Sequence, residues 1–221
     1  MTTTLEGPEH RPASGGAPKK IVLLLHGLGA DGDDLIGLAP HIAPALPDAV
    51  FLSPHAPFPC DMAPYGRQWF SFQDRSPEMV LAGVQAAVPF INAFIDGELA
   101  RTGLTADRLA LVGFSQGTMM SLFVAPRRAP QIACVVGYSG RVIAADLLAA
   151  ELRSKPPVLL VHGQADGVVP FESLALSEAA LKTAGIPVTA LSRPRLGHSI
   201  DEVGLSRGGQ FLAEHLGRSV S

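Results

Sequence analysis

The chain has 221 residues, of which 47% are hydrophobic and 17% are charged, and its formal net charge is −3 at pH 7. This length suits one α/β domain with a sizeable core. The weak negative charge and the scattered Lys and Arg residues argue against a nucleic-acid partner, and two cysteines are too few for a disulfide framework.

The N-terminal segment is typical of a tail. Residues 1–18 are rich in Gly, Pro and Thr and lack an apolar stretch, so we expect a flexible tail and no signal peptide. Residues 19–217 are then expected to form a single domain. The sequence has no run of about 18 apolar residues, which predicts no membrane insertion and a cytoplasmic protein.

The first predicted strand, 21–25, is followed by the glycine-rich turn 26–29. A glycine-rich turn after a strand can cradle a phosphate. Here Asp31, Asp33 and Asp34 follow the turn and would repel an anion. We therefore interpret the turn as a source of backbone N–H groups that do not bind a phosphate.

Residues 53–75 form a long irregular segment after a helix predicted near 33–46 and a strand at 50–52. The segment contains four prolines and several large apolar side chains, namely Phe58, Met62, Tyr65, Trp69, Phe70 and Phe72. Loops of this length are usually functional, although core packing is the alternative for each of these side chains. Apolar residues at helical spacing then predict a helix over 80–102.

The sequence Gly-Phe-Ser-Gln-Gly occupies 113–117, at the end of an apolar run and before a helix-like segment. This is the context of a nucleophile elbow, in which a sharp turn exposes the serine. Gly113 and Gly117 leave room for the turn, Ser115 is the candidate nucleophile, and the backbone N–H of Gln116 is a candidate oxyanion donor. The alternative is an ordinary strand–turn–helix connection with Ser115 as the helix N-cap.

A candidate acid and a candidate base follow in the order Ser115, Asp166, His198. Asp166 comes after an apolar strand at 158–161, and His198 comes after a strand at 188–191. This is the chain order of α/β-hydrolase triads. The carboxyl ends of parallel strands share one edge of a sheet, so we expect the three side chains to meet. Taken singly, Asp166 is also a helix cap and His198 a surface histidine, but their joint order and placement favour the triad.

Strands and helices alternate along the chain, which predicts right-handed βαβ crossovers. The remaining predicted elements are strands at 108–114 and 132–137 and helices at 119–125, 171–184 and 202–216. We therefore expect an α/β protein with the α/β-hydrolase fold. Its central sheet should be mostly parallel, with helices on both faces and no large cap domain.

These motifs together resemble the phospholipase/carboxylesterase family, which includes acyl-protein thioesterases and small bacterial carboxylesterases. The resemblance spans about 21–216 and rests on His26-Gly27-Leu28-Gly29, Trp69-Phe70, Gly113-Phe114-Ser115-Gln116-Gly117, His162-Gly163-x-x-Asp166-x-Val168-Val169-Pro170 and Gly197-His198. The loop 55–75 departs from the segment found in protein-depalmitoylating members.

The resemblance implies ester or thioester hydrolysis without a cofactor. It implies that Ser115, Asp166 and His198 are the triad. The backbone N–H groups of Leu28 and Gln116 are then the oxyanion donors. Because the family places its tryptophan near the active site, Trp69 is expected to line the substrate pocket. Met119, just past the elbow, is a second candidate substrate-binding residue.

The sequence thus predicts a serine carboxylesterase that hydrolyses short-to-medium acyl esters, with thioesters as a further class, through an acyl-serine intermediate. Its expected partner is a small-molecule ester, and a homodimer is compatible with the sequence. No metal is expected, because the sequence has no H-E-x-x-H motif and no Cys/His cluster.

Two alternatives stay open. A dienelactone hydrolase shares the fold but uses a cysteine nucleophile, whereas the elbow residue here is Ser115 and Cys134 lies in a predicted strand. A non-catalytic binding module on a hydrolase scaffold typically lacks a triad member.

Overall fold

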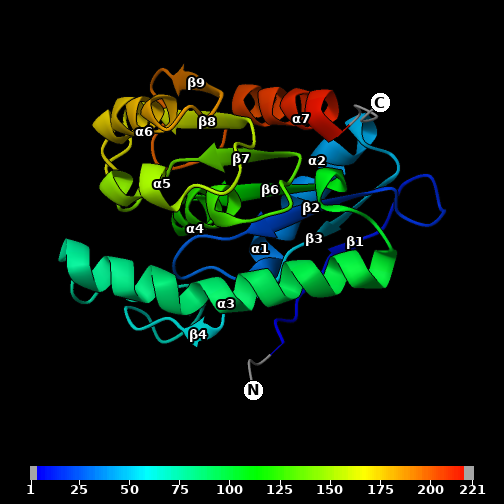
Figure 1. Ribbon diagram of the computed structural model, residues 1–221, viewed down its shortest axis with the longest axis horizontal. Helices are drawn as coiled ribbons and strands as arrows, with labels where there is room; N and C mark the ends of the chain where they lie inside the picture. Colours follow the sequence, from blue (N-terminus) through cyan, green and yellow to red (C-terminus); the bar gives the residue numbers. More distant parts are fainter. Residues whose placement is uncertain (1–3, 217–221) are drawn as a thin grey trace.

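The computed structural model describes residues 4–216, which form a seven-stranded sheet covered by helices on both faces (Figure 1). The strands of this sheet are β1 Glu9–His10, β2 Lys20–Leu25, β3 Ala49–Leu52, β6 Leu109–Phe114, β7 Cys134–Tyr138, β8 Val158–Gly163 and β9 Val188–Arg193. Their order is β1-β3-β2-β6-β7-β8-β9, and all neighbours are parallel except β1 with β3. The predicted mostly parallel sheet is confirmed.

The helices form two layers over two separate cores (Figure 1). They are α1 Gly32–Leu35, α2 Ala39–Ile42, α3 Pro77–Thr102, α4 Gln116–Val124, α5 Ala145–Glu151, α6 Glu172–Thr183 and α7 Glu202–Leu216. The side chain of Leu23 points into the core under α3–α6, and Val22 and Leu24 point into the core under α1, α2 and α7. Both faces of β2 are therefore buried, as expected for a parallel strand covered by helices on both sides.

The register of the sheet aligns the carboxyl ends of its central strands. Leu25 of β2 is opposite Gly113 of β6, and Phe114 of β6 is opposite Tyr138 of β7. Tyr138 is in turn opposite Val161 near the end of β8. The segments that follow these strands consequently leave the sheet at one edge, where open α/β sheets bind their ligands.

Helix α3 has 26 residues and is followed by Gly103, whose φ of 70° is the left-handed conformation of a helix C-cap. It buries Val84, Ile91 and Ile95 and lies beside α4 on one face of the sheet (Figure 1). An 18-residue window within it has a mean hydropathy of 1.5, so by length and composition alone α3 could cross a membrane. No such segment was predicted from the sequence, and long core helices also meet this criterion.

The described part of the predicted tail, residues 4–18, is attached to the domain. Leu5 is only 7% exposed and packs in the core under α3–α6, and Glu9 pairs with Leu52 where β1 joins the sheet. The prediction of a flexible tail is thus corrected over these residues, because burial and strand pairing hold them. Residues 1–3 of that tail and residue 217 of the predicted domain lie outside the described part.

Two other predictions differ from the structure in detail. The helix predicted near 33–46 is divided into α1, α2 and two short 3-10 turns, because Pro40 and Pro44 lack the backbone N–H that a continuous helix requires. The segment 53–75 is not wholly irregular, since β4 Phe58–Pro59 pairs with β5 Arg67–Gln68.

The packing of α7 on β7 gives a testable prediction about stability. A Cβ at Gly208 would stand 1.9 Å from the hydroxyl oxygen of Tyr138, so Gly208→Ala should lower the free energy of unfolding by about 1–3 kcal/mol through overpacking. Tyr138→Phe removes that oxygen and should recover part of the loss, which a double-mutant cycle in urea measures.

The control for this prediction is the neighbouring glycine on the same helix. A Cβ at Gly209 would meet only Ile42 Cγ2 at 3.9 Å, an ordinary contact, so Gly209→Ala should be neutral or stabilising. Strict additivity of Gly208→Ala and Tyr138→Phe would contradict the proposed clash.

Candidate active site

Ser115 lies at the sharp turn between β6 and α4, with a φ of 53° and a ψ of −113°. A non-glycine residue in this region is strained and persists only when its surroundings hold it there. The two flanking glycines allow the surrounding backbone to pack closely enough to hold this conformation. A Cβ at Gly113 would stand 2.4 Å from Thr118 N, and a Cβ at Gly117 would stand 1.8 Å from the carbonyl oxygen of Leu25. The predicted elbow geometry is therefore present, and side chains at either glycine would prevent it.

The glycine-rich turn after β2 lies directly against this elbow. A Cβ at Gly27 would be 3.4 Å from Ser115 Cβ, so the two segments are in contact. The backbone N–H of Leu28 has no recorded acceptor within the described residues. Gln116 is the first residue of α4, where an N–H has no partner in its own helix. The two predicted oxyanion donors thus belong to adjoining segments.

A buried histidine holds the turn in this position. His26 Nε2 accepts the N–H of Ala56 at 2.9 Å, and Nδ1 lies 2.7 Å from the carbonyl oxygen of Gly27. This pattern assigns the proton to Nδ1. Burial lowers the pKa of His26, so the ring stays neutral. His26 is therefore a support of the turn.

Trp69 and Gln116 connect the 53–75 loop to the same place. The Trp69 indole donates a hydrogen bond to the carbonyl oxygen of His26 at 3.0 Å. The Gln116 side chain accepts the N–H of Trp69 at 2.8 Å and donates to the carbonyl oxygen of Phe70 at 2.7 Å. Three segments distant in sequence are therefore joined by buried hydrogen bonds.

The two predicted pocket residues are both buried. Trp69 is 0% exposed and Met119 is 3% exposed. In this conformation neither side chain offers much surface to an acyl chain, and the hydrogen bonds of Trp69 give it a structural role. Contact of Trp69 and Met119 with substrate stays a prediction.

Asp166 and His198 meet at the same edge of the sheet. His198 Nδ1 lies 2.8 Å from Asp166 Oδ2, and the ring of His198 packs against Phe114, the residue before the elbow serine. With the Nδ1 proton donated to the carboxylate, Nε2 is left as an acceptor. The structure thus places the predicted acid and base in hydrogen-bond contact beside the elbow.

The carboxylate of Asp166 is held by further donors. The backbone N–H groups of Val168 and Val169 each donate to Oδ1 at 2.9 Å. Burial by itself raises the pKa of Asp166, but the hydrogen bonds from His198 and from these two N–H groups outweigh it, and the pKa lies below its ordinary value. Asp166 is therefore ionised at neutral pH.

His162 is a further residue of the site, named in the sequence analysis only as part of a motif. Its Nε2 lies 3.2 Å from Asp166 Oδ2 and 3.0 Å from the carbonyl oxygen of Val169. Both side chains are almost fully buried. His162 thus lies beside the carboxylate that contacts His198, and its Nε2–H bonds to the carbonyl oxygen of Val169, whose own N–H donates to Asp166. The signal was the H-G-x-x-D spacing, which places His162 four residues before the acid.

Two other candidate residues are engaged elsewhere. Asp201, the nearest alternative acid in sequence, pairs with Arg193 at 2.8 Å and accepts the N–H of Gly204 at the start of α7. Cys134 is fully buried, and burial raises the pKa of its thiol. A buried thiol of raised pKa is a poor nucleophile, so the structure does not favour the cysteine chemistry of a dienelactone hydrolase.

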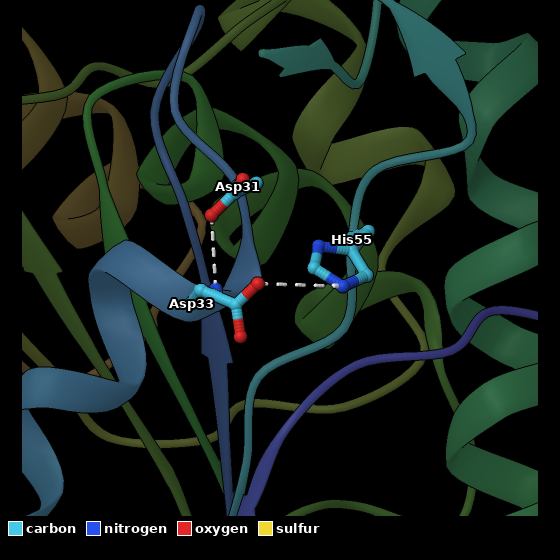
Figure 2. Close-up of side chains that lie close together, drawn as sticks. All are labelled: Asp31, Asp33 and His55. Carbon is cyan, nitrogen blue, oxygen red and sulfur yellow. Dashed lines mark hydrogen bonds and ion pairs between the residues drawn. The ribbon is translucent and has the colours of Figure 1, made fainter.

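Figure 2 shows the one grouping of possible metal ligands recorded among the described residues, Asp31, Asp33 and His55, whose ligand atoms lie within 4.8 Å of one another. His55 Nδ1 accepts the N–H of Gly32 at 3.1 Å, which places the imidazole proton on Nε2, the nitrogen that faces Asp33. Asp31 Oδ1 accepts the N–H groups of Asp33 and Asp34 as the N-cap of α1. A metal would need the Nε2 lone pair, so this group is better explained as helix capping.

The hydrogen bonds of Asp166 predict a pH-dependent stability. Because its folded-state pKa is depressed, the ionised group stabilises the fold at pH values above its unfolded pKa, and this contribution is lost as the pH falls through the folded pKa. Asp166→Asn should therefore be less stable than wild type at pH 7, with a difference that shrinks below about pH 4. Urea unfolding of both proteins at several pH values measures this, and a constant difference would contradict it.

His162 gives a second prediction. His162→Leu removes the N–H that bonds to Val169 beside Asp166. It leaves a buried carbonyl unpaired next to the acid, and should lower kcat about tenfold with a smaller effect on KM. His162→Gln keeps an N–H near the same position and should recover most of the loss. Ester turnover of each variant, measured below its melting temperature, tests this. Equal losses in both variants would mean that ring packing, not the hydrogen bond, is what matters.

The sequence and the fold have known relatives. The sequence profile of the Phospholipase/Carboxylesterase family matches residues 12–216. The chain is similar to Esterase YpfH of Escherichia coli (strain K12), with 30% identity over 198 residues, 90% of this chain and 82% of that protein. It is similar to Acyl-protein thioesterase 1 of Neurospora crassa, with 30% identity over 216 residues, 88% of this chain and 86% of that protein.

The crystal structure of esterase PE8 has the same fold, with a TM-score of 0.92 and 38% identity, covering 97% of this chain and 100% of that one. The family match extends over nearly the whole chain and includes every motif described above. The chain therefore belongs to the phospholipase/carboxylesterase family of α/β-hydrolases.

Proposed function

We propose that this chain is a serine carboxylesterase with Ser115 as the nucleophile, His198 as the general base and Asp166 as the carboxylate that orients the base. The observation that carries the proposal is the 2.8 Å contact between His198 Nδ1 and Asp166 Oδ2, formed at the sheet edge where the strained elbow holds Ser115. The relatives named as esterases support the same conclusion.

The reaction follows from these positions. The Ser115 hydroxyl attacks the acyl carbon while His198 Nε2 takes its proton, and a tetrahedral oxyanion forms. The oxyanion collapses, the bond to the leaving group breaks, and His198 gives its proton to the leaving oxygen or sulfur. Water then attacks the acyl-serine by the same route, which releases the acid and restores Ser115. Asp166 stays ionised and stabilises the imidazolium in both halves of the reaction.

The backbone N–H groups of Leu28 and Gln116 are proposed to stabilise the oxyanion. Donors fixed before the reaction starts cost no reorganisation when charge develops, and removal of one such donor typically costs about 100-fold or more in kcat. The bonds of His26, Trp69 and Gln116 fix these donors. This mechanism uses no metal or cofactor.

The substrate is proposed to be a small-molecule ester with a short-to-medium acyl chain. Each buried methylene adds about 0.8 kcal/mol of binding, so preference should rise with chain length until the available cavity is filled. Thioesters are included because relatives are named acyl-protein thioesterases. A cytoplasmic location and a homodimer remain parts of this proposal.

A labelling experiment tests the assignment of the nucleophile. A fluorophosphonate should add once to the wild-type protein, at Ser115, and intact mass and peptide mapping locate the adduct. Ser115→Ala should prevent the adduct and reduce ester turnover by several orders of magnitude, because the triad acts as a unit.

Asp166→Asn should lower kcat by up to about 10⁴-fold. Far-UV circular dichroism of both variants controls for folding. Labelling at another residue, or near-normal turnover by Ser115→Ala, would reject the assignment.

A further inference from the structure

A cavity of about 660 Å³ lies beside the proposed active site, between the start of α3, the segment 141–147 and α6. In Figure 1 these three parts lie together at one end of the sheet, the end where β7 terminates. The apolar lining of the cavity includes Val80, Leu81, Val142, Ile143, Leu147 and Leu176. Its volume is in the ordinary range for a small-molecule site.

The wall of this cavity begins next to the elbow. Gly140 precedes the wall residue Arg141, and a Cβ at Gly140 would stand 2.9 Å from the carbonyl oxygen of Ser115. The following N–H, that of Val142, is bound to Ser177 Oγ at 3.0 Å, which fixes the wall against α6. The wall of the cavity therefore begins one residue after a segment that touches the backbone of the elbow.

Two arginines line the cavity without a recorded partner. Neither Arg75 nor Arg141 has a carboxylate or carbonyl within bonding distance in the described part of the chain. Two carboxylates, Glu78 and Asp146, also face the cavity. Each stands in the first turn of a helix, α3 and α5 respectively, where the helix N-terminus offsets negative charge. The positive charges of the Arg75 and Arg141 guanidinium groups are not offset by a helix terminus in this way.

We propose that this cavity binds the far end of an acyl chain that carries a terminal carboxylate. The methylenes would cover the apolar lining, and the carboxylate would meet Arg75 and Arg141. This inference rests on the proposed esterase function and names its substrate class, the half-esters of dicarboxylic acids. An exposed ion pair favours binding by up to about fivefold, so two guanidinium groups should produce a measurable preference.

Three p-nitrophenyl esters with the same six-carbon acyl chain test the proposal. They are the mono-ester of adipic acid, which is an anion, the neutral hexanoate, and the cationic ω-aminohexanoate. We expect kcat/KM for the adipate to exceed that for the hexanoate at least fivefold at low ionic strength, and the preference to fall as salt is added. Arg75→Gln and Arg141→Gln should each lower the adipate-to-hexanoate ratio severalfold.

Two further variants set the controls. Asp146→Asn removes a negative charge from the cavity and should raise the same ratio. Arg153 is exposed, has no recorded side-chain partner and does not line the cavity; it precedes β8 and so lies toward the opposite edge of the sheet. Arg153→Gln should leave the ratio unchanged.

The outcomes separate the two proposals. Turnover of the hexanoate with no preference for the adipate, or a ratio insensitive to Arg75→Gln and Arg141→Gln, overturns the anion site and leaves the esterase function intact. A preference for the aminohexanoate also overturns it and assigns the specificity to Glu78 and Asp146. Failure to hydrolyse any of the three esters, with no fluorophosphonate adduct, overturns the esterase function itself.

Discussion

The structure depends on a close backbone contact between the end of β2 and the start of α4. Only a glycine at 117 lets the carbonyl oxygen of Leu25 come so near the elbow helix. That approach puts the Gly27 turn against Ser115, so both proposed oxyanion donors are positioned by main-chain packing. Thr118 Oγ1 lies 2.8 Å from the carbonyl oxygens of both Gly113 and Tyr138, which connects the elbow helix to β6 and β7. Catalytic geometry is therefore a property of the fold as much as of the side chains.

Buried polar side chains also hold the segments of the site together, through hydrogen bonds. His26, Trp69, Gln116 and His162 are each 2% exposed or less, and each has hydrogen-bond partners. Burying such groups without partners would cost several kcal/mol, roughly 2–7 for an amide or hydroxyl, so their arrangement is strongly specified. The first three connect the 53–75 loop to the oxyanion turn and the elbow. His162 lies at the other end of the site, beside the carboxylate of Asp166, and bonds to the carbonyl oxygen of Val169.

The sequence was sufficient for those parts of the site that follow from chain order and strand topology. Parallel strands end at one edge, so Ser115, Asp166 and His198 could be predicted to converge from their positions after strands. Contacts that depend on the direction of a side chain could not be predicted from the sequence. A tryptophan that fills a core cannot be distinguished in the sequence from one that lines a pocket. Trp69 was predicted to line the pocket, and its side chain is buried. The attachment of the N-terminal segment was missed because the pairing of β1 with β3 joins residues about forty positions apart.

The proposed chemistry and the proposed specificity rest on different kinds of residue. The triad and the oxyanion turn are held by glycine contacts and buried hydrogen bonds, where most substitutions would disturb folding. The charged residues around the cavity, such as Arg75 and Arg141, are exposed and lack recorded partners, and surface substitutions of this kind change stability little. Substrate range can therefore change in this fold without altering the reaction. This is a physical reason why one family can include proteins named esterase and acyl-protein thioesterase.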